Sequence, residues 1–242
     1  MPLLNHFVAP LNVSHPWRGF HSTWAATIAR QLNDGVLPPR FHAIPNVDLG
    51  GPLEIDVATL RDEDVLAPQP TGATSAWAAP AATVVVPVDF PAEELIEVQV
   101  FYNDGEPRLM ASIELVSPAN KDRLAHRRGF TVKCASYLNG GASVVVVDVV
   151  TDRRANLHQA LVDLLDLPPE AAWQSPTNLY AAAYRMLAKE EQAQLEIWRE
   201  PLTLGMPLPQ LPLWLGVDLA VELDLERSYM ATCHDLRIRL AG

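Results

Sequence analysis

The sequence has few cysteines and no long apolar run. Cys134 and Cys233 stand far apart among 242 residues, which excludes a disulfide framework and a cysteine-rich zinc set. No uninterrupted apolar stretch approaches the roughly 20 residues that a membrane-spanning helix needs. The amino-terminal residues also lack the basic and apolar regions of a signal peptide. We therefore expect a cytoplasmic protein that does not enter a membrane.

Two common catalytic patterns are also missing. The paired glycines of the chain have no phosphate-loop pattern around them, and no Gly-x-Ser-x-Gly elbow is present. The sequence therefore predicts neither a nucleotide-binding fold of the phosphate-loop type nor an acyl hydrolase. The 49% hydrophobic and 19% charged residues are ordinary for a globular protein, and 242 residues can bury a large core. We expect one domain over residues 1–242.

Basic residues are outnumbered, with 18 Lys and Arg against 29 Asp and Glu and a formal net charge of −11. This balance disfavours non-specific binding to nucleic acid. One segment, residues 121–133, is nevertheless basic and contains the single acid Asp122. It either attracts an anion such as nucleic acid, over a Debye length of about 8 Å, or is a solvated helix face. Its basic residues are Lys121, Arg123, Arg127, Arg128 and Lys133.

Hydrophobic periodicity predicts alternating strands and helices. We expect a surface loop at residues 65–82 and a proline-rich connection up to Leu213. Predicted strands cover residues 41–49, 53–60, 83–88, 95–102, 109–116, 143–150, 179–187 and 194–198. Predicted helices cover residues 17–33, 120–138, 156–165 and 221–233.

The strand at 143–150 is β-branched almost throughout, as expected of an internal strand covered on both faces. With the strand at 109–116 and the intervening helix it forms one crossover unit. The first two strands, joined across Gly50, Gly51 and Pro52, form a hairpin. These patterns predict an α/β fold with a mixed central sheet flanked by helices, extra strands and a C-terminal helix.

Glu114 is the residue with the clearest chemical implication. A carboxylate on a buried strand needs a partner, because an unpaired buried charge costs several kcal/mol. Asp56 lies on a predicted neighbouring strand. Two such carboxylates and the carbonyl oxygen of Leu115 could hold Mg²⁺, and a nearby lysine could stabilise developing charge. This chemistry favours hydrolysis of phosphodiester bonds.

Several motifs together resemble a known family over nearly the whole chain. They are Phe20-His21-Ser22 with Trp24-Ala25, Leu37-Pro38-Pro39, Glu54-Ile55-Asp56-Val57-Ala58-Thr59, Glu114-Leu115-Val116-Ser117-Pro118-Ala119-Asn120-Lys121, and Tyr229 with Asp235-Leu236-Arg237. The sequence resembles the bacterial domain of unknown function family 4058, whose members are similar to the Uma-type endonucleases of the PD-(D/E)XK nuclease superfamily.

The resemblance implies a restriction-endonuclease-like core within residues 41–150, with Asp56 as the first acid and Glu114 as the second. Val116 stands where that pattern usually has its lysine, so the basic role moves to the following helix. There Lys133, with Tyr137 and Gly140 after it, resembles the helical lysine of the Uma-type proteins. Mg²⁺, or Mn²⁺ as a substitute, would be bound by Asp56, Glu114 and Leu115. Additional site candidates are Glu54 and Lys121, and candidates for phosphate contact are Arg123, Arg127 and Arg128.

Each role has a structural alternative. Asp56 could pair with an arginine, Glu114 could bond to the turn at 117–121, Lys133 could be a solvated helix residue, and Asp148 could be a simple strand-end residue. The sequence therefore leaves two functions open. One is a Mg²⁺-dependent endonuclease that acts on DNA or RNA. The other is a catalytically inactive binding or scaffold protein with the nuclease fold.

Overall fold

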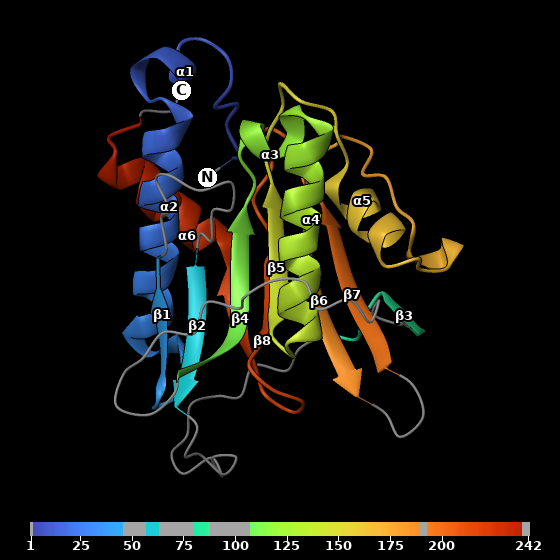
Figure 1. Cartoon of the computed structure of the whole chain (residues 1–242). Helices are drawn as coiled ribbons and strands as arrows, with labels where there is room; N and C mark the ends of the chain where they lie inside the picture. The colour runs from blue at the N-terminus through green and yellow to red at the C-terminus, as the bar shows by residue number, and fades with distance from the viewer. Residues whose placement is uncertain (1, 46–56, 63–79, 88–106, 189–192, 239–242) are drawn as a thin grey trace.

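The computed structural model describes residues 2–45, 57–62, 80–87, 107–188 and 193–238 (Figure 1). In chain order its elements are α1 (Leu11–Ser14), α2 (Trp17–Gln31), η1 (Leu32–Val36), β1 (Phe41–Ile44), β2 (Val57–Asp62), β3 (Val84–Pro87), β4 (Pro107–Leu115), α3 (Pro118–Asp122), α4 (Leu124–Asn139), β5 (Ser143–Asp148), α5 (Leu157–Leu164), η2 (Pro169–Ala171), β6 (Tyr180–Ala188), β7 (Ala193–Pro201), β8 (Gln210–Trp214), β9 (Ala220–Asp224) and α6 (Leu225–Asp235).

Within these described residues, seven strands form one mixed sheet in the order β1-β2-β4-β5-β6-β7-β3. Strands β4 and β5 are parallel, and the other neighbouring pairs are antiparallel. The connection from β4 to β5 passes through α3 and α4, as a parallel pair requires. The predicted α/β fold with a mixed, helix-flanked sheet and a C-terminal helix is confirmed.

Helices cover both faces of this sheet (Figure 1), and each face carries its own apolar layer. Helices α2 and α6 and the β8-β9 hairpin pack on one face, where Val145 and Val147 belong to the same apolar layer as Trp24 and Tyr229. Helices α4 and α5 cover the other face, where the alternate residues of β5 lie. All six residues of β5 are buried, as the β-branched run predicts for an internal strand.

The amino-terminal helix matches its prediction, because Phe20, Trp24 and Ile28 are all buried along α2. The prediction of a single helix at residues 120–138 is wrong in one respect. The structure has two helices there, α3 and α4, because Arg123 between them has an extended conformation with φ −109° and ψ 154°. Ser117 and Asn120 cap α3 reciprocally, so this short turn is a stable unit of its own.

The C-terminal prediction requires a larger correction. The connection expected to run up to Leu213 contains β8, and the helix expected from Val221 begins only at Leu225. The intervening residues Ala220–Asp224 form β9, which pairs antiparallel with β8. Burial alternates along β9 with a period of two, the pattern of a half-buried strand. Asp224 ends the strand and caps α6 by accepting a hydrogen bond from the Arg227 amide at 2.8 Å.

The predicted first hairpin is confirmed by the antiparallel pairing of β1 with β2, in which Phe41 lies opposite Arg61. The hairpin turn at 50–52, the predicted strand at 95–102 and most of the loop at 65–82 lie outside the described residues. No helix in the described ranges combines the length and the apolar character that a membrane span requires.

Candidate functional site

Glu114 and Lys133 form a buried ion pair between β4 and α4. The Lys133 Nζ donates to Glu114 Oε2 at 2.7 Å, and the two side chains are only 4% and 1% exposed. The Ser112 hydroxyl donates to the other carboxylate oxygen at 3.0 Å. Each oxygen of Glu114 therefore has a donor, and Lys133 is a buried partner rather than a solvated helix lysine.

Sequence periodicity explains how the two elements bring these groups together. Along β4, Ile113 belongs to the layer that contacts α2, so Ser112 and Glu114 point to the opposite face, which α4 covers. On α4, Phe130, Lys133 and Tyr137 are buried at three- and four-residue intervals and so share one helix face, whereas His126, one turn earlier, is exposed. The strand thus presents its acid to the face of the helix that carries the lysine.

The backbone carbonyl of Leu115, a predicted metal ligand, accepts a hydrogen bond from the Nε2 of His21 at 2.7 Å. The His21 ring stacks on Trp17, with ring centroids 5.2 Å apart and an interplanar angle of 14°. His21 therefore belongs to the immediate surroundings of the candidate site.

A second buried ion pair lies nearby and joins Lys121 of α3 to Asp148, the last residue of β5. The Lys121 Nζ donates to Asp148 Oδ2 at 2.7 Å, and both side chains are fully buried. Burial raises the pKa of Asp148 to about 6, while the adjacent Lys121 ammonium opposes that rise. Lys121 is predicted to be an additional site residue. In the structure it bonds to Asp148 and so fixes α3 to the end of β5.

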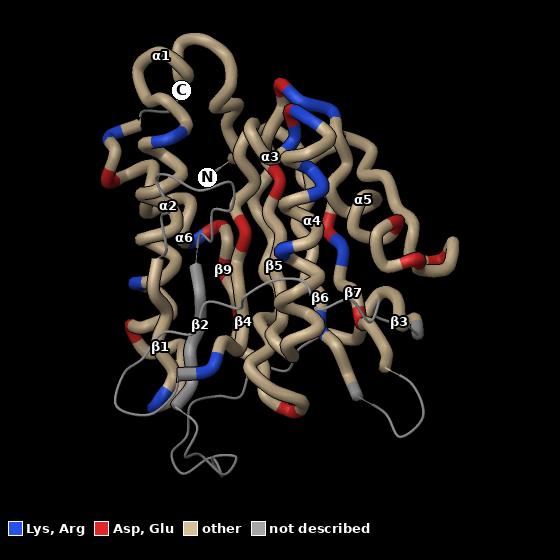
Figure 2. Tube along the Cα trace, in the orientation of Figure 1, with Lys and Arg blue, Asp and Glu red and all other residues tan. Residues whose placement is uncertain are grey.

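The three predicted phosphate-contacting residues lie at the end of the molecule where α3 and the start of α4 meet. Figure 2 shows Lys and Arg segments gathered at this end. Arg123 and Arg128 are exposed, and Arg127 is half-buried. Arg123 approaches Asp122 at 3.9 Å, a weak contact between two solvated groups. The arginines therefore present positive charge near the carboxyl end of β4.

The remaining predicted site residues, Asp56 and Glu54, lie outside the described residues. The first described residue of β2, Val57, pairs with Ile113, which precedes Glu114. In the part of the chain that the structure describes, no three His, Cys, Asp or Glu side chains form a group that could hold a metal ion.

No role in the candidate site is predicted from the sequence for Ser112, His21 or Asp148. A signal for two of them was present in the pattern. Ser112 stands two residues before Glu114 on the same strand face, and Asp148 ends a run of buried valines, where an acid requires a cation. The partner of Asp148 and the contact of His21 depend on tertiary packing, which spacing along the chain does not reveal.

The fold and these two ion pairs define the protein as an α/β protein with buried Lys–carboxylate pairs on one face of a mixed sheet. No family model, curated protein or solved structure matches the chain. The nuclease-like interpretation therefore depends on the residues themselves.

Proposed function

We propose that the chain is a restriction-endonuclease-like protein that hydrolyses phosphodiester bonds of nucleic acid with Mg²⁺, or with Mn²⁺ as a substitute. The Glu114–Lys133 pair is the observation that carries this proposal, since an acid on a strand and a lysine 2.7 Å away are two of the groups such chemistry uses. The β4–α4–β5 crossover, which joins these groups, supports the nuclease-like core. A cytoplasmic location accords with this role.

The proposed metal ligands are Glu114, the Leu115 carbonyl and Asp56, with Glu54 as an additional acid. All are oxygen donors, which Mg²⁺ prefers, and the ion would polarise the phosphate and its attacking water. Lys133 would stabilise the negative charge that develops on the phosphate. The phosphodiester backbone would lie against Arg123, Arg127 and Arg128, which are placed at the adjoining end of α3 and α4.

The described donors fit a divalent ion only in part. They comprise one carboxylate and one carbonyl, and both oxygens of the carboxylate already accept hydrogen bonds. A cation at Glu114 would therefore share the carboxylate with Lys133. The affinity for metal depends on whether Asp56 supplies the second negative charge, because one carboxylate that is already paired offers little net attraction.

Calorimetric titration with Mg²⁺ and Mn²⁺, together with cleavage assays on DNA and RNA, tests this proposal. We expect metal binding and cleavage by the unmodified chain, and loss of both in Glu114→Gln and in Asp56→Asn. Glu170→Gln is the matched control, because Glu170 is an exposed acid on η2. Absence of metal binding and of cleavage in the unmodified chain would refute the catalytic proposal.

A second candidate function is a binding or scaffold protein that keeps the nuclease-like fold without its chemistry. The close Glu114–Lys133 pair favours this second function, because the Lys133 ammonium can balance the charge of the Glu114 carboxylate without a metal ion. The net charge of −11 also opposes nucleic-acid binding. Under this function, Glu114→Gln changes stability, while the unmodified chain neither binds Mg²⁺ nor cleaves nucleic acid.

A further inference from the structure

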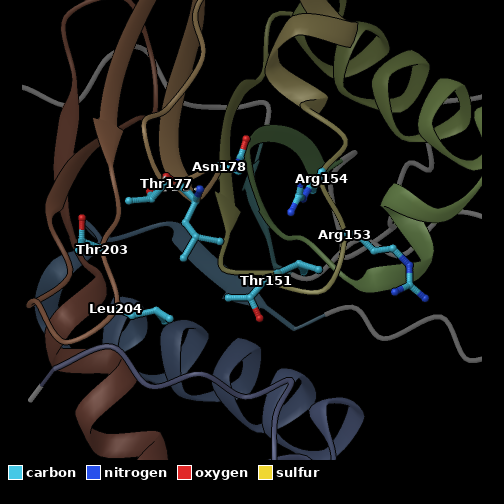
Figure 3. Close-up of a pocket in the computed structure, with 9 residues that line it drawn as sticks. Thr151, Arg153, Arg154, Thr177, Asn178, Thr203 and Leu204 are labelled. Carbon is cyan, nitrogen blue, oxygen red and sulfur yellow. Dashed lines mark hydrogen bonds between the residues drawn. The ribbon is translucent and has the colours of Figure 1, made fainter.

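A cavity of about 440 Å³ opens at the carboxyl end of β5 (Figure 3), and neither Glu114 nor Lys133 lines it. Three segments line it: residues 150–154 after β5, residues 177–179 before β6, and residues 203–204 after β7. A volume of this size lies within the range of small-molecule sites in proteins. The cavity is therefore large enough for an organic ligand.

The lining carries positive charge and no acid. Its charged residues are Arg153 and Arg154. Arg153 is engaged elsewhere: its Nη1 lies 3.1 Å from Asp152, its Nε lies 3.9 Å from Asp122, and Figure 3 shows its guanidinium directed away from the other lining residues. Arg154 has no ion-pair partner among the described residues. Its guanidinium is a planar set of five donors suited to phosphate or carboxylate.

Neutral donors accompany this arginine. The Asn178 side-chain oxygen accepts from Gln174 at 2.6 Å, which turns the carbonyl end of the amide to Gln174 and leaves its nitrogen as a donor. Asn178, in a turn with a left-handed backbone conformation of φ 60°, lines the cavity. The Thr203 hydroxyl also has no hydrogen-bond partner within the described ranges. Arg154 and the Asn178 amide complement an anion with several acceptor oxygens, and the Thr203 hydroxyl can bond to another part of the ligand.

The walls of the cavity are held in place from within the fold. Asp148 Oδ1 accepts from the Val150 amide at 3.1 Å, and the buried Lys121 ammonium bonds the same carboxylate and lies 3.5 Å from the Val150 carbonyl. The Thr177 hydroxyl donates to the Leu202 carbonyl, which joins the second segment to the third. A site whose walls are fixed before binding loses less entropy when a ligand enters.

We propose that this cavity binds a small phosphate monoester, with the phosphate on Arg154 and Asn178 and the rest of the ligand extending toward Thr203, which Figure 3 shows on the other side of the cavity. A phosphate group fills only part of the volume. The remaining space is bordered by Val150, Leu179 and Leu204, whose apolar side chains suit a sugar or a nucleoside attached to the phosphate. Binding at this cavity is independent of the proposed metal chemistry at Glu114, because none of the lining residues belongs to that site.

Calorimetry on the full chain with adenosine 5′-monophosphate, ribose 5-phosphate and adenosine tests the proposal. We expect at least one phosphate monoester to bind at about 1 mM or below, and adenosine to bind at least tenfold more weakly than its monophosphate. Tighter binding of the nucleotide than of ribose 5-phosphate identifies a nucleoside group in the ligand, and the reverse identifies a sugar phosphate. Equal binding of adenosine and its monophosphate, or no binding of either monoester, overturns the proposal.

Substitutions at Arg154 test whether the phosphate monoester binds in this cavity. Arg154→Ala should weaken the monoester about tenfold or more, because it removes charge-assisted hydrogen bonds. Arg154→Lys should restore part of the affinity, since it keeps the charge and loses the planar fork. Arg18→Ala, at an exposed arginine of α2, is the control and should bind as the unmodified chain does. Equal affinity in Arg154→Ala and Arg18→Ala, with both variants folded by circular dichroism, would place any binding elsewhere and refute the assignment.

Discussion

Lys133→Met should lower the free energy of unfolding by about 3–5 kcal/mol, because it leaves the charge of Glu114 buried without its cation. At 2.7 Å and an effective dielectric constant near 20, the attraction between the two charges is about 6 kcal/mol. Desolvation of the two ions offsets most of this attraction in the intact pair. Removal of one partner takes away the attraction but leaves the desolvation cost of the other, so a single substitution is far more harmful than the net value of the pair suggests.

A double-mutant cycle isolates this interaction. Glu114→Gln keeps the shape of the side chain and an acceptor for Ser112, and the double variant removes both charges. We expect the double variant to be more stable than the sum of the single losses predicts, by about 2 kcal/mol or more. Urea unfolding followed by circular dichroism at pH 7 measures all four proteins. Arg128→Met, at an exposed position on the same helix, is the control and should change stability by less than about 0.5 kcal/mol.

Two results would refute this reasoning. One is a loss of under about 1 kcal/mol in Lys133→Met, within the range of an exposed pair. The other is strict additivity of the two substitutions, which would mean that Glu114 and Lys133 do not interact in solution.

Three further predictions concern the surrounding structure. Burial raises the pKa of Asp148 to about 6 from 3.8, so the native state binds more protons than the unfolded state between these values, and the contribution of Asp148 to stability should fall as the pH rises through this window. Urea unfolding of the unmodified chain and of Asp148→Asn from pH 4 to pH 7 tests this prediction. The same change of the free energy of unfolding with pH in both proteins would contradict it. Ser117→Ala should cost about 1 kcal/mol by removing the cap of α3, as measured by thermal unfolding; an unchanged melting temperature would argue against the cap. Tyr229→Phe removes the hydroxyl that accepts from the Leu4 amide at 3.0 Å, so hydrogen exchange at that amide should accelerate, and unchanged protection there would show that the bond is dispensable.

The long, strongly periodic elements of the fold could be predicted from the sequence. Helix α2 and strand β5 show their patterns locally, since burial on one face or on both faces leaves a direct trace in residue order. The β8-β9 hairpin could not be predicted in this way. Pro212 lies within β8, opposite Glu222, and proline normally argues against a strand. A two-stranded hairpin tolerates it, because its strands have free edges.

The candidate site could be predicted to a similar extent. Glu114 is predicted because a buried strand acid needs a partner, and Lys133 is predicted because it resembles the helical lysine of the Uma-type proteins. The bond between Lys121 and Asp148 was not predicted, although both residues were noted. It depends on the break at Arg123, which gives α3 a direction separate from α4, and on the parallel alignment of β5 with β4. Neither the break at Arg123 nor the parallel alignment of β5 with β4 produces a recognisable pattern in the nearby sequence.

The position of β3 has a consequence for how the chain folds during synthesis. Strand β3 follows the first hairpin in sequence, yet it pairs at the opposite edge of the sheet with β7, where Val84 lies beside Ile197. On the ribosome, β1, β2, β4 and β5 can assemble as they emerge, but β3 must wait until β7 has been made. Non-local pairings of this kind slow folding and leave strand edges exposed in the meantime. This apolar segment, Val84–Pro87, therefore needs protection from aggregation in the nascent chain until β7 has been made.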